Sequence, residues 1–355
     1  MTSYRALFIG VASVGALAIA SHAAGPARGL TSVAGIKVGH YTMPGRPTGC
    51  TVILPPDGAI ASVDVRGGAP ATKETELLNP VNHVQSVNAL VLSGGSAFGL
   101  DATTGVMRYL EEHGIGYNAR GIKVPIVPAA SLIDLWFGGD YHIRPNADCG
   151  YKAAQAASDG PVPEGNVGAG AGATVGKIID LEHGMKAGLG TSAITLPNGL
   201  IVAALVAVNA VGDIIDPATS RVIAGVRSDD GKSLQDTRTL LRNGMAFRPR
   251  AGENTTLGVV ATNAKLTKVE VQKMAQMAHD GYARAIAPTH TMGDGDTIFA
   301  VATGSLESGG ANVNVSIVGA LAADAMSAAI VRAATEATAL GGLPAARDLG
   351  TLPRR

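Results

Sequence analysis

Residues 254–262 read Asn-Thr-Thr-Leu-Gly-Val-Val-Ala-Thr, in which residues 255–261 form an apolar run that opens with a hydroxyl residue. The run follows residues 228–253, a polar and proline-bearing stretch that is typical of an exposed linker. A second apolar run, residues 297–303, begins directly after Asp-Gly-Asp at residues 294–296. Short apolar runs bounded by turn residues indicate buried strands. We therefore expect two strands that lie side by side, each with polar residues at its start.

The peptide bond between Asn254 and Thr255 is a possible site of self-cleavage. A threonine hydroxyl is a weak nucleophile at neutral pH and needs a base within hydrogen-bonding reach. An α-amino group has a reference pKa of about 8, so a threonine at a chain start carries both nucleophile and base. Thr255 gains this form if its hydroxyl attacks the carbonyl of Asn254 and the chain is cut there. The dipeptide alone favours an ordinary strand start, because Asn and Thr are common at such positions.

Two acids and a histidine precede the second apolar run. Asp294 and Asp296 lie two residues apart, so in an extended segment their side chains point to the same face. There they can hold an ammonium and a hydroxyl through charge-assisted hydrogen bonds. The alternatives are a calcium loop or a plain Asp-Gly turn, and the further oxygen ligands of an EF-hand loop are missing. His290 is a candidate general base, but a lone histidine before a turn more often has a structural hydrogen bond.

Two further polar residues are candidates for a site. Asn209 interrupts the apolar run 206–211, and a buried amide must find partners, so it is either an oxyanion donor or a structural residue. Residues 168–177 read Gly-Ala-Gly-Ala-Gly-Ala-Thr-Val-Gly-Lys and superficially match a phosphate-binding loop. Ala171 and Ile178 stand where that loop requires a glycine and a hydroxyl residue. We expect instead a loop whose backbone approaches a substrate, with Lys177 at its end.

The remaining pattern alternates strands and helices, which predicts a layered α/β sandwich with a mixed sheet. The expected strands are residues 51–54, 60–65, 89–92, 255–262 and 297–303, with a hairpin over 187–216 that turns at residues 197–199; the expected helices stop at Gly114, begin at Thr267 with a capping box, and run from about Ser316 to Ala339.

Composition narrows the class of protein. Lys and Arg number 28 and Asp and Glu also number 28, so no basic surface for nucleic acid or an anionic membrane is indicated. Hydrophobic residues make up 46% and charged residues 16% of the 355, which is typical of a compact enzyme, often an oligomer. The two cysteines, Cys50 and Cys149, can form a disulfide or remain as two buried thiols.

The N-terminus resembles an export signal. Arg5 gives a positive start, residues 6–20 are apolar, and Ser-His-Ala at 21–23 fits a small-x-small cleavage site. We therefore predict a signal peptide over residues 1–23 and a periplasmic or secreted protein. The alternatives are an uncleaved anchor or a misassigned start, and without a signal the protein is cytoplasmic.

Several blocks together resemble the family of self-processing aminopeptidases that includes L-aminopeptidase/D-amidases, β-peptidyl aminopeptidases and nylon-oligomer (6-aminohexanoate oligomer) endo-hydrolases. The resemblance is closest to the nylon-oligomer branch and covers about residues 29–340. The blocks are residues 63–69 (Val-Asp-Val-Arg-Gly-Gly-Ala), 92–100 (Leu-Ser-Gly-Gly-Ser-Ala-Phe-Gly-Leu), 165–177, 254–256 (Asn-Thr-Thr) and 294–297 (Asp-Gly-Asp-Thr).

The resemblance implies a fold and an assembly. The fold is a four-layer αββα sandwich with mixed sheets. It is cut by its own nucleophile into an α-chain, residues 24–254, and a β-chain, residues 255–355, which together form one catalytic domain. The αβ units are expected to assemble into homo-tetramers or larger rings.

The resemblance also implies site residues. Thr255 matches the nucleophile that cleavage after Asn254 exposes. Asp294 and Asp296 match the paired acids of the nylon-hydrolase branch. Lys177 and Asn209 match a lysine and an asparagine near the nucleophile, with Asn209 as oxyanion donor. The residues expected to contact substrate are Gly94, Gly95, Ser96 and Ile133, although family members carry a substrate-contacting tyrosine where this chain has Ile133.

The predicted function is hydrolysis of small or linear amides, such as N-terminal residues of peptides, β-amino acid amides or 6-aminohexanoate oligomers. No metal or organic cofactor is expected. A first alternative is an acyltransferase with the chemistry of ornithine acetyltransferases. A second is an exported binding protein without catalysis.

Overall fold

The computed structural model describes residues 29–245, 254–306 and 313–352. The predicted signal peptide, residues 1–23, lies outside these ranges, and so does the end of the predicted linker, residues 246–253.

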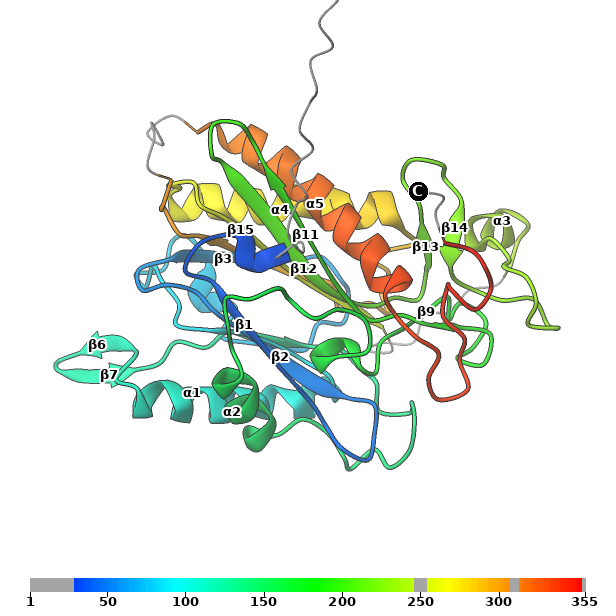
Figure 1. Cartoon of the computed structure of the whole chain (residues 1–355), viewed down its shortest axis with the longest axis horizontal. Coiled ribbons are helices and arrows are strands. Elements are labelled where there is room, and N and C mark those ends of the chain that lie inside the picture. The colour runs from blue at the N-terminus through cyan, green and yellow to red at the C-terminus, as the bar shows by residue number, and fades with distance from the viewer. Residues whose placement is uncertain (1–28, 246–253, 307–312, 353–355) are drawn as a thin grey trace, which may run out of the picture.

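The strand that starts at Thr255 is the centre of a five-stranded mixed sheet (Figure 1). It is parallel to the strand that starts at Thr297, which confirms that the two predicted strands lie side by side. On its other side it is antiparallel to the strand that ends at Asn209. All eight of its residues are buried, because both faces of the sheet are covered. In order across the sheet the strands are β11 (Leu189–Thr195), β12 (Ile201–Asn209), β15 (Thr255–Thr262), β17 (Thr297–Ala302) and β3 (Ile60–Val65).

Two long helices, α4 (Lys268–Ala285) and α5 (Val315–Thr335), pack against each other and cover one face of this sheet (Figure 1). The predicted capping box is present, since Thr267 and Glu270 bond each other's backbone N–H groups. By length and composition α5 is apolar enough to cross a membrane, but here it is a core helix with most of its surface buried. It ends at Thr335, before the expected Ala339, and its alanines let it approach β11 closely.

A second five-stranded sheet faces the first across a shared apolar core. Its strands, in order, are β1 (Lys37–Thr42), β2 (Gly49–Leu54), β5 (Leu90–Ser93), β8 (Ala129–Ser131) and β4 (Thr72–Lys73). The predicted strands 51–54 and 60–65 are therefore present but belong to different sheets. The core residues shared by the two sheets include Ile53, Leu92, Leu205, Leu257 and Phe299.

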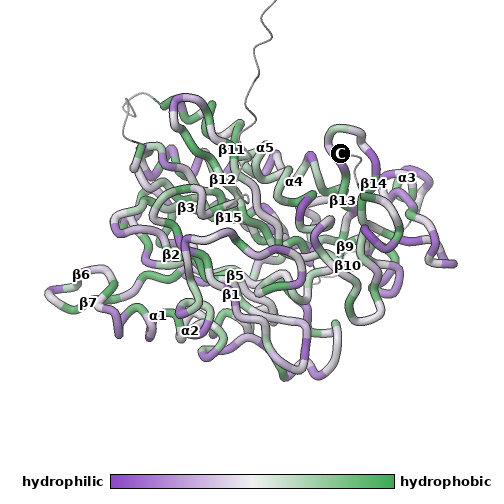
Figure 2. The backbone as a smooth tube through the Cα atoms, in the orientation of Figure 1, coloured by the Kyte–Doolittle hydropathy of each residue, from purple (hydrophilic) through white to green (hydrophobic). Residues whose placement is uncertain are grey.

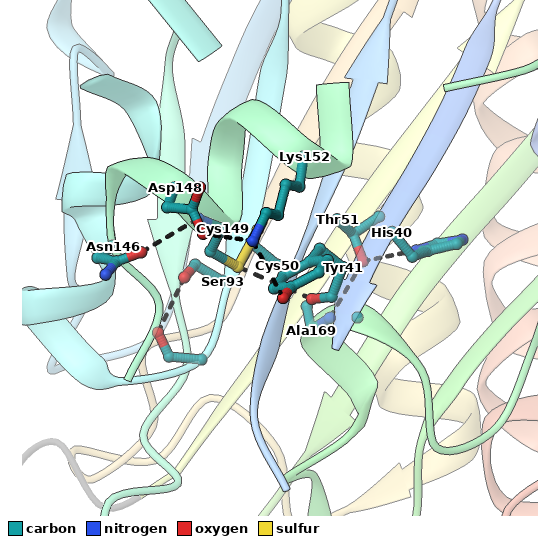
Figure 3. Close-up of a disulfide and its surroundings, with 12 residues drawn as sticks. His40, Tyr41, Cys50, Thr51, Ser93, Asn146, Asp148, Cys149, Lys152 and Ala169 are labelled. Atoms are coloured by element: carbon teal, nitrogen blue, oxygen red, sulfur yellow. Dashed lines mark hydrogen bonds and ion pairs between the residues drawn. A yellow bond between two sulfur atoms is a disulfide. The ribbon is translucent and has the colours of Figure 1, made fainter. Parts of the chain in front are cut away.

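Helices α1 (Ala102–Glu112) and α2 (Ala147–Gln155) pack together over the outer side of the second sheet. A disulfide between Cys50 in β2 and Cys149 in α2 links this helix pair to the sheet, which resolves the open question of whether the two cysteines pair (Figure 3). Gly114, with a φ of 67°, ends α1 as expected.

Short elements complete the fold. The predicted linker is wrong in part, because residues 237–242 form a helix whose first residue, Thr237, is fully buried and donates its N–H to Asp213. Hydrophobic segments follow the central strands, and hydrophilic ones gather in the outer loops near this helix (Figure 2). The remaining elements are β6 (Tyr117–Ala119), β7 (Ile122–Val124), β9 (Thr174–Val175), β10 (Met185–Lys186), β13 (Asp213–Ile215), β14 (Val222–Ala224), α3 (Thr237–Arg242) and β16 (Ile286–Ala287), with 3-10 turns η1 (Gly29–Ser32), η2 (Glu76–Leu78), η3 (Ser96–Asp101) and η4 (Gly168–Gly170).

Candidate active site

Thr255 lies at the end of the space between the two sheets. Strand residues alternate between faces, so Thr255 shares its face with Leu257, Val259 and Ala261, which belong to the core between the sheets. Asn209 is the direct β12 partner of Thr255 and ends the equivalent row on the neighbouring strand. The strand register therefore brings the candidate nucleophile and the candidate oxyanion donor together.

The hydroxyl of Thr255 contacts the peptide bond that precedes it. Its Oγ1 donates to the carbonyl oxygen of Asn254 at 2.5 Å. The N–H of Gly295 donates to the same carbonyl oxygen at 2.9 Å. Both residues of the junction are almost fully buried, Asn254 at 6% and Thr255 at 3% exposure. A hydroxyl and an N–H donor thus converge on one carbonyl that water hardly reaches.

Asp294 turns back on its own loop. Its Oδ2 accepts from the N–H of Thr291 at 3.0 Å and from the Thr291 hydroxyl at 2.5 Å. Burial and the negative charge of Asp296 raise the pKa of Asp294 to about 6, against the opposing effects of Thr291 and the Lys177 charge. A carboxyl of this kind changes its protonation state close to neutral pH.

Asp296 is held from two sides. Its Oδ1 accepts the N–H of Thr256 at 2.8 Å. Its Oδ2 accepts from the hydroxyl of Thr289 at 3.0 Å, and from the N–H and ring Nδ1 of His290 at 3.0 and 2.8 Å. Burial raises the pKa of Asp296, but the hydrogen bonds and charge of His290 and the N–H of Thr256 outweigh it, so the pKa lies below its usual value. The two neighbouring acids are therefore pushed in opposite directions, as in active sites that divide roles between two carboxyls.

The side chains of Asn209 and Lys177 contact each other. The Oδ1 of Asn209 accepts from Lys177 Nζ at 2.7 Å, and from the N–H and hydroxyl of Thr174 at 3.1 and 3.2 Å. Its Nδ2 donates to the carbonyl of Ile133 at 2.9 Å. These contacts fix the amide with its carbonyl toward the glycine-rich loop and its NH2 group toward the loop after β8 of the second sheet. An NH2 group has two hydrogens, so one remains for another acceptor.

The predicted substrate-contacting loop, residues 94–96, contacts a buried ion pair. Gly95 donates its N–H to Asp134 Oδ1 at 3.0 Å, and a Cβ on Gly94 would come within 2.2 Å of Asp134 Oδ2. Asp134 pairs with Arg46 at 2.7 Å, and both side chains are fully buried. Because Asp134 directly follows Ile133, this pair connects the backbone of residues 94–96 to the partner of Asn209.

Sequence reasoning missed several of these supporting residues. Arg46 and Asp134 lie 88 positions apart, and nothing local announces their contact. The block at residues 63–69 was noticed, and the structure gives its role: the N–H groups of Arg66 and Gly67 donate to the carbonyl of Asp296. A Cβ on Gly67 would lie 2.2 Å from the Asp296 nitrogen, so this position needs glycine. His290 was interpreted as a structural hydrogen-bonding residue, and it does bond, but to a candidate site residue.

Comparisons with known proteins were made for sequence and for structure. The sequence profile of peptidase family S58 matches residues 28–347. An uncharacterised aminopeptidase of Mycobacterium leprae (strain TN) is 42% identical over 347 residues, which cover 90% of this chain and 94% of that protein. A 6-aminohexanoate-oligomer endohydrolase of Kocuria sp. (strain KY2) is 31% identical over 311 residues, 84% of each chain.

Two solved structures are similar in fold. The L-aminopeptidase D-Ala-esterase/amidase of Ochrobactrum anthropi, described as a variant of the Ntn hydrolase fold, superposes with a TM-score of 0.67 at 20% identity, covering 93% of this chain and 96% of that one. A β-aminopeptidase of Burkholderia sp. gives a TM-score of 0.66 at 23% identity with the same coverage. The family resemblance read from the sequence blocks is confirmed, and so is the presence of mixed sheets. The chain belongs to peptidase family S58 and is a peptidase or amidohydrolase.

Proposed function

We propose that this protein is a self-cleaving amide hydrolase in which Thr255 becomes an N-terminal nucleophile. The observation that carries the proposal is the contact of the Thr255 hydroxyl with the carbonyl of Asn254, shared with the Gly295 N–H. The same packing supports the four-layer αββα arrangement, with α4 and α5 on one sheet and α1 and α2 on the other.

Self-cleavage needs no outside reagent except water. Thr255 Oγ1 attacks the carbonyl carbon of Asn254, and the Gly295 N–H stabilises the negative oxygen that forms. The C–N bond then breaks, the hydroxyl proton ends on the Thr255 nitrogen, and an ester joins the two residues. Water hydrolyses the ester, leaving a carboxylate on Asn254 and a free amine on Thr255. The products are the chains 24–254 and 255–355, or 1–254 if the signal peptide remains.

Turnover repeats this chemistry on a substrate. The new amine takes the proton of its own hydroxyl while the oxygen attacks the substrate amide. The second hydrogen of the Asn209 amide and the Gly295 N–H are placed to serve the oxyanion. The amine returns the proton to the leaving amine, and water releases the acyl group from Thr255. Asp294 and Asp296 hold the threonine ammonium between steps, and Lys177 keeps Asn209 oriented.

The substrates proposed are small or linear amides. One relative is described as an aminopeptidase and another as a 6-aminohexanoate-oligomer endohydrolase, so both classes are candidates. The paired Asp294 and Asp296 favour the second class. Initial rates on an α-dipeptide, a β-dipeptide and a 6-aminohexanoate oligomer, measured side by side, decide among them.

The direct test compares two valine variants of one strand. Thr255 and Thr262 lie at opposite ends of β15, and both donate a hydroxyl to a backbone carbonyl, of Asn254 and Ile201 respectively. We expect T255V to remain a single chain without turnover, and T262V to split and to hydrolyse substrate. A T255V protein that splits would show that another residue is the nucleophile.

The wild-type protein and the two valine variants also test the two alternative functions, an acyltransferase and a binding protein without catalysis. An acyltransferase would pass the acyl group to an added amine such as ornithine in preference to water, which product analysis detects. A binding protein without catalysis would remain one chain in both wild type and T262V.

Export and assembly belong to the proposal as well. Cell fractionation with and without residues 1–23 tests whether they direct export. Light scattering of the purified protein tests the expectation of a homo-tetramer or larger assembly of αβ units.

A further inference from the structure

We infer that His290 is a positioning residue for this reaction: its ring holds the Asp296 carboxylate in the orientation that binds the Thr256 N–H, and through it fixes Thr255. The inference rests on the proposed function of Thr255. Two hydrogen bonds in series carry it, from the ring of His290 to Asp296 and from Asp296 to the backbone N–H of Thr256, which is joined to Thr255 by a peptide bond.

The backbone at His290 is shaped for this contact. Its φ is 56°, a left-handed conformation that non-glycine residues seldom adopt. In this conformation the residue points both its N–H and its ring Nδ1 at one oxygen, Asp296 Oδ2, at 3.0 and 2.8 Å. Such a conformation costs free energy, and residues that keep it are concentrated at functional sites.

The ring is also held from the helix side. It stacks on Tyr282 at 5.7 Å and meets the edge of His279 at 4.8 Å between ring centres. The Tyr282 hydroxyl donates to the carbonyls of Thr256 and Thr297 at 3.2 and 3.4 Å. Helix α4 thus contacts the starts of β15 and β17 directly, through the Tyr282 hydroxyl. It contacts Asp296 indirectly, because Tyr282 stacks on His290 and His290 binds Asp296.

The tautomer follows from the partners. A carboxylate only accepts, so Nδ1 of His290 carries the hydrogen that it donates to Asp296. His279 donates from Nε2 to the carbonyl of Asp64 at 3.1 Å, which leaves its Nδ1 as an acceptor. Nδ1 of His279 and Nε2 of His290 are both buried and find no hydrogen-bond partner among the described residues. Within the described part of the chain, the hydrogen-bond partners of the His290 ring are Asp296 Oδ2 at 2.8 Å and the Thr289 hydroxyl at 3.5 Å, both at Nδ1.

Among the described residues, charged and titratable groups surround this contact from the loop, from α4 and from the end of β3. Asp294 lies in the same loop, and Lys177 acts on it from the glycine-rich loop. His279 and Tyr282 face the ring from α4, while Asp64 and Arg66 form a pair at the end of β3. The negative charge of Asp296 is one cause of the raised pKa of Asp294, so a change at Asp296 also alters the titration of Asp294. Loss of a donor to the charged form raises the apparent pKa of the pair.

The experiment uses the wild-type sequence with substitutions that fit the left-handed backbone. H290G removes the ring without backbone strain, whereas H290N keeps an N–H donor close to the position of Nδ1. H142G is the matched control. The backbone N–H and the ring Nδ1 of His142 both bond to Asp140 Oδ1, at 2.9 and 2.8 Å, but both side chains are exposed to solvent.

For H290G we expect self-cleavage and kcat to fall roughly 10- to 100-fold with little change in KM, as for loss of one hydrogen bond to a charged group. The acid side of its kcat–pH profile should move to higher pH. H290N should recover most of the rate, and H142G should match wild type. If H290G does not fold, H290A replaces it, because Ala offers no donor to Asp296 and brings no negative charge beside it.

Two results would overturn the inference: an H290G protein with wild-type kcat and pH profile, or an H290N protein as defective as H290G. Either result leaves the proposed function standing if T255V is still unprocessed. A processed and active T255V would overturn the proposed function, whatever His290 does.

Discussion

At the scale of single residues, the junction Asn254–Thr255 is a candidate site through the family resemblance, because the dipeptide alone favours an ordinary strand start. The acids Asp294 and Asp296 are candidates because they precede the next apolar run and match a block of the same family. The partners of these acids could not be identified from the sequence. His290 and Thr291 are ordinary in sequence, and only the folded loop directs their donors at the carboxylates.

The raised pKa of Asp294 predicts an acid limit to activity. The pKa is about 6 because burial and the charge of Asp296 disfavour ionisation. Below that pH the carboxyl is neutral and cannot hold the threonine ammonium, so kcat should fall as the pH drops through about 6. Measuring kcat from about pH 4 to 8 checks this. D294N should have a lower kcat over the whole pH range, and its kcat should no longer fall as the pH drops through about 6. If kcat of D294N still falls there, another group is responsible for the acid limit.

Lys177 is predicted to act through Asn209. K177M removes the charged donor 2.7 Å from Asn209 Oδ1 and leaves the N–H and hydroxyl of Thr174 as its donors. A hydrogen bond from a charged group contributes about 1.5–3 kcal/mol. Self-cleavage and kcat should both fall by roughly 10- to 100-fold. K152M is the control, because Lys152 also has a charged partner, Asp148, but on the exposed side of α2. Equal rates for K177M and wild type would exclude this role.

At the scale of elements, apolar runs and turn residues predicted the strands well because each is a local signal. The run 255–262 forms β15 with the same boundaries, and the hairpin 187–216 turns where Asn198-Gly199 predicts. The polar stretch after residue 228 was less predictable. Its helix α3 exists because buried Asp213 accepts the Thr237 N–H, a contact between residues 24 positions apart.

The packing of α5 on β11 gives a prediction at this scale. A Cβ on Gly190 would lie 2.1 Å from the backbone oxygen of Ala329, so G190A must push the helix away from the sheet. We expect a loss of about 1–3 kcal/mol in the free energy of unfolding, measured by denaturant titration. G160A is the control, because a Cβ there would make only an ordinary contact with the Ser158 hydroxyl at 3.6 Å. Equal stability of the two variants would contradict the close approach of α5.

At the scale of the whole molecule, the sequence predicted layers of helices and strands but not which strand joins which sheet. Strands β2 and β3 follow each other in the chain, yet they lie in different sheets, because a short proline-bearing turn carries the chain from one sheet to the other. The site is assembled from both sheets, with Thr255 and Asn209 from one and Ile133 from the loop after β8 of the other. Such distant pairings have no local signal.

Buried histidines predict how global stability responds to pH. Burial lowers the pKa of His40 to about 4, so between that pH and about 6.5 the unfolded chain binds the extra proton. The stability that His40 contributes is therefore complete above pH 6.5 and is lost as the pH falls toward 4, by up to about 3 kcal/mol. Burial raises the pKa of Asp213 to about 6. The folded protein therefore binds the extra proton there, and the contribution of Asp213 to stability increases as the pH falls.

Because these effects oppose each other, the test is a difference between proteins. Compared with wild type, H40N should gain relative stability as the pH is lowered from about 6.5 to 4 in parallel denaturant titrations. A stability difference that does not change with pH would show that His40 is not neutral in the folded protein.

The most direct measurement for the whole account is N-terminal sequencing of the purified, active protein together with its intact mass. Self-cleavage at Asn254 predicts two chains, one of which begins Thr-Thr-Leu-Gly at residue 255. Full amide-hydrolysing activity from a single uncut chain would contradict it.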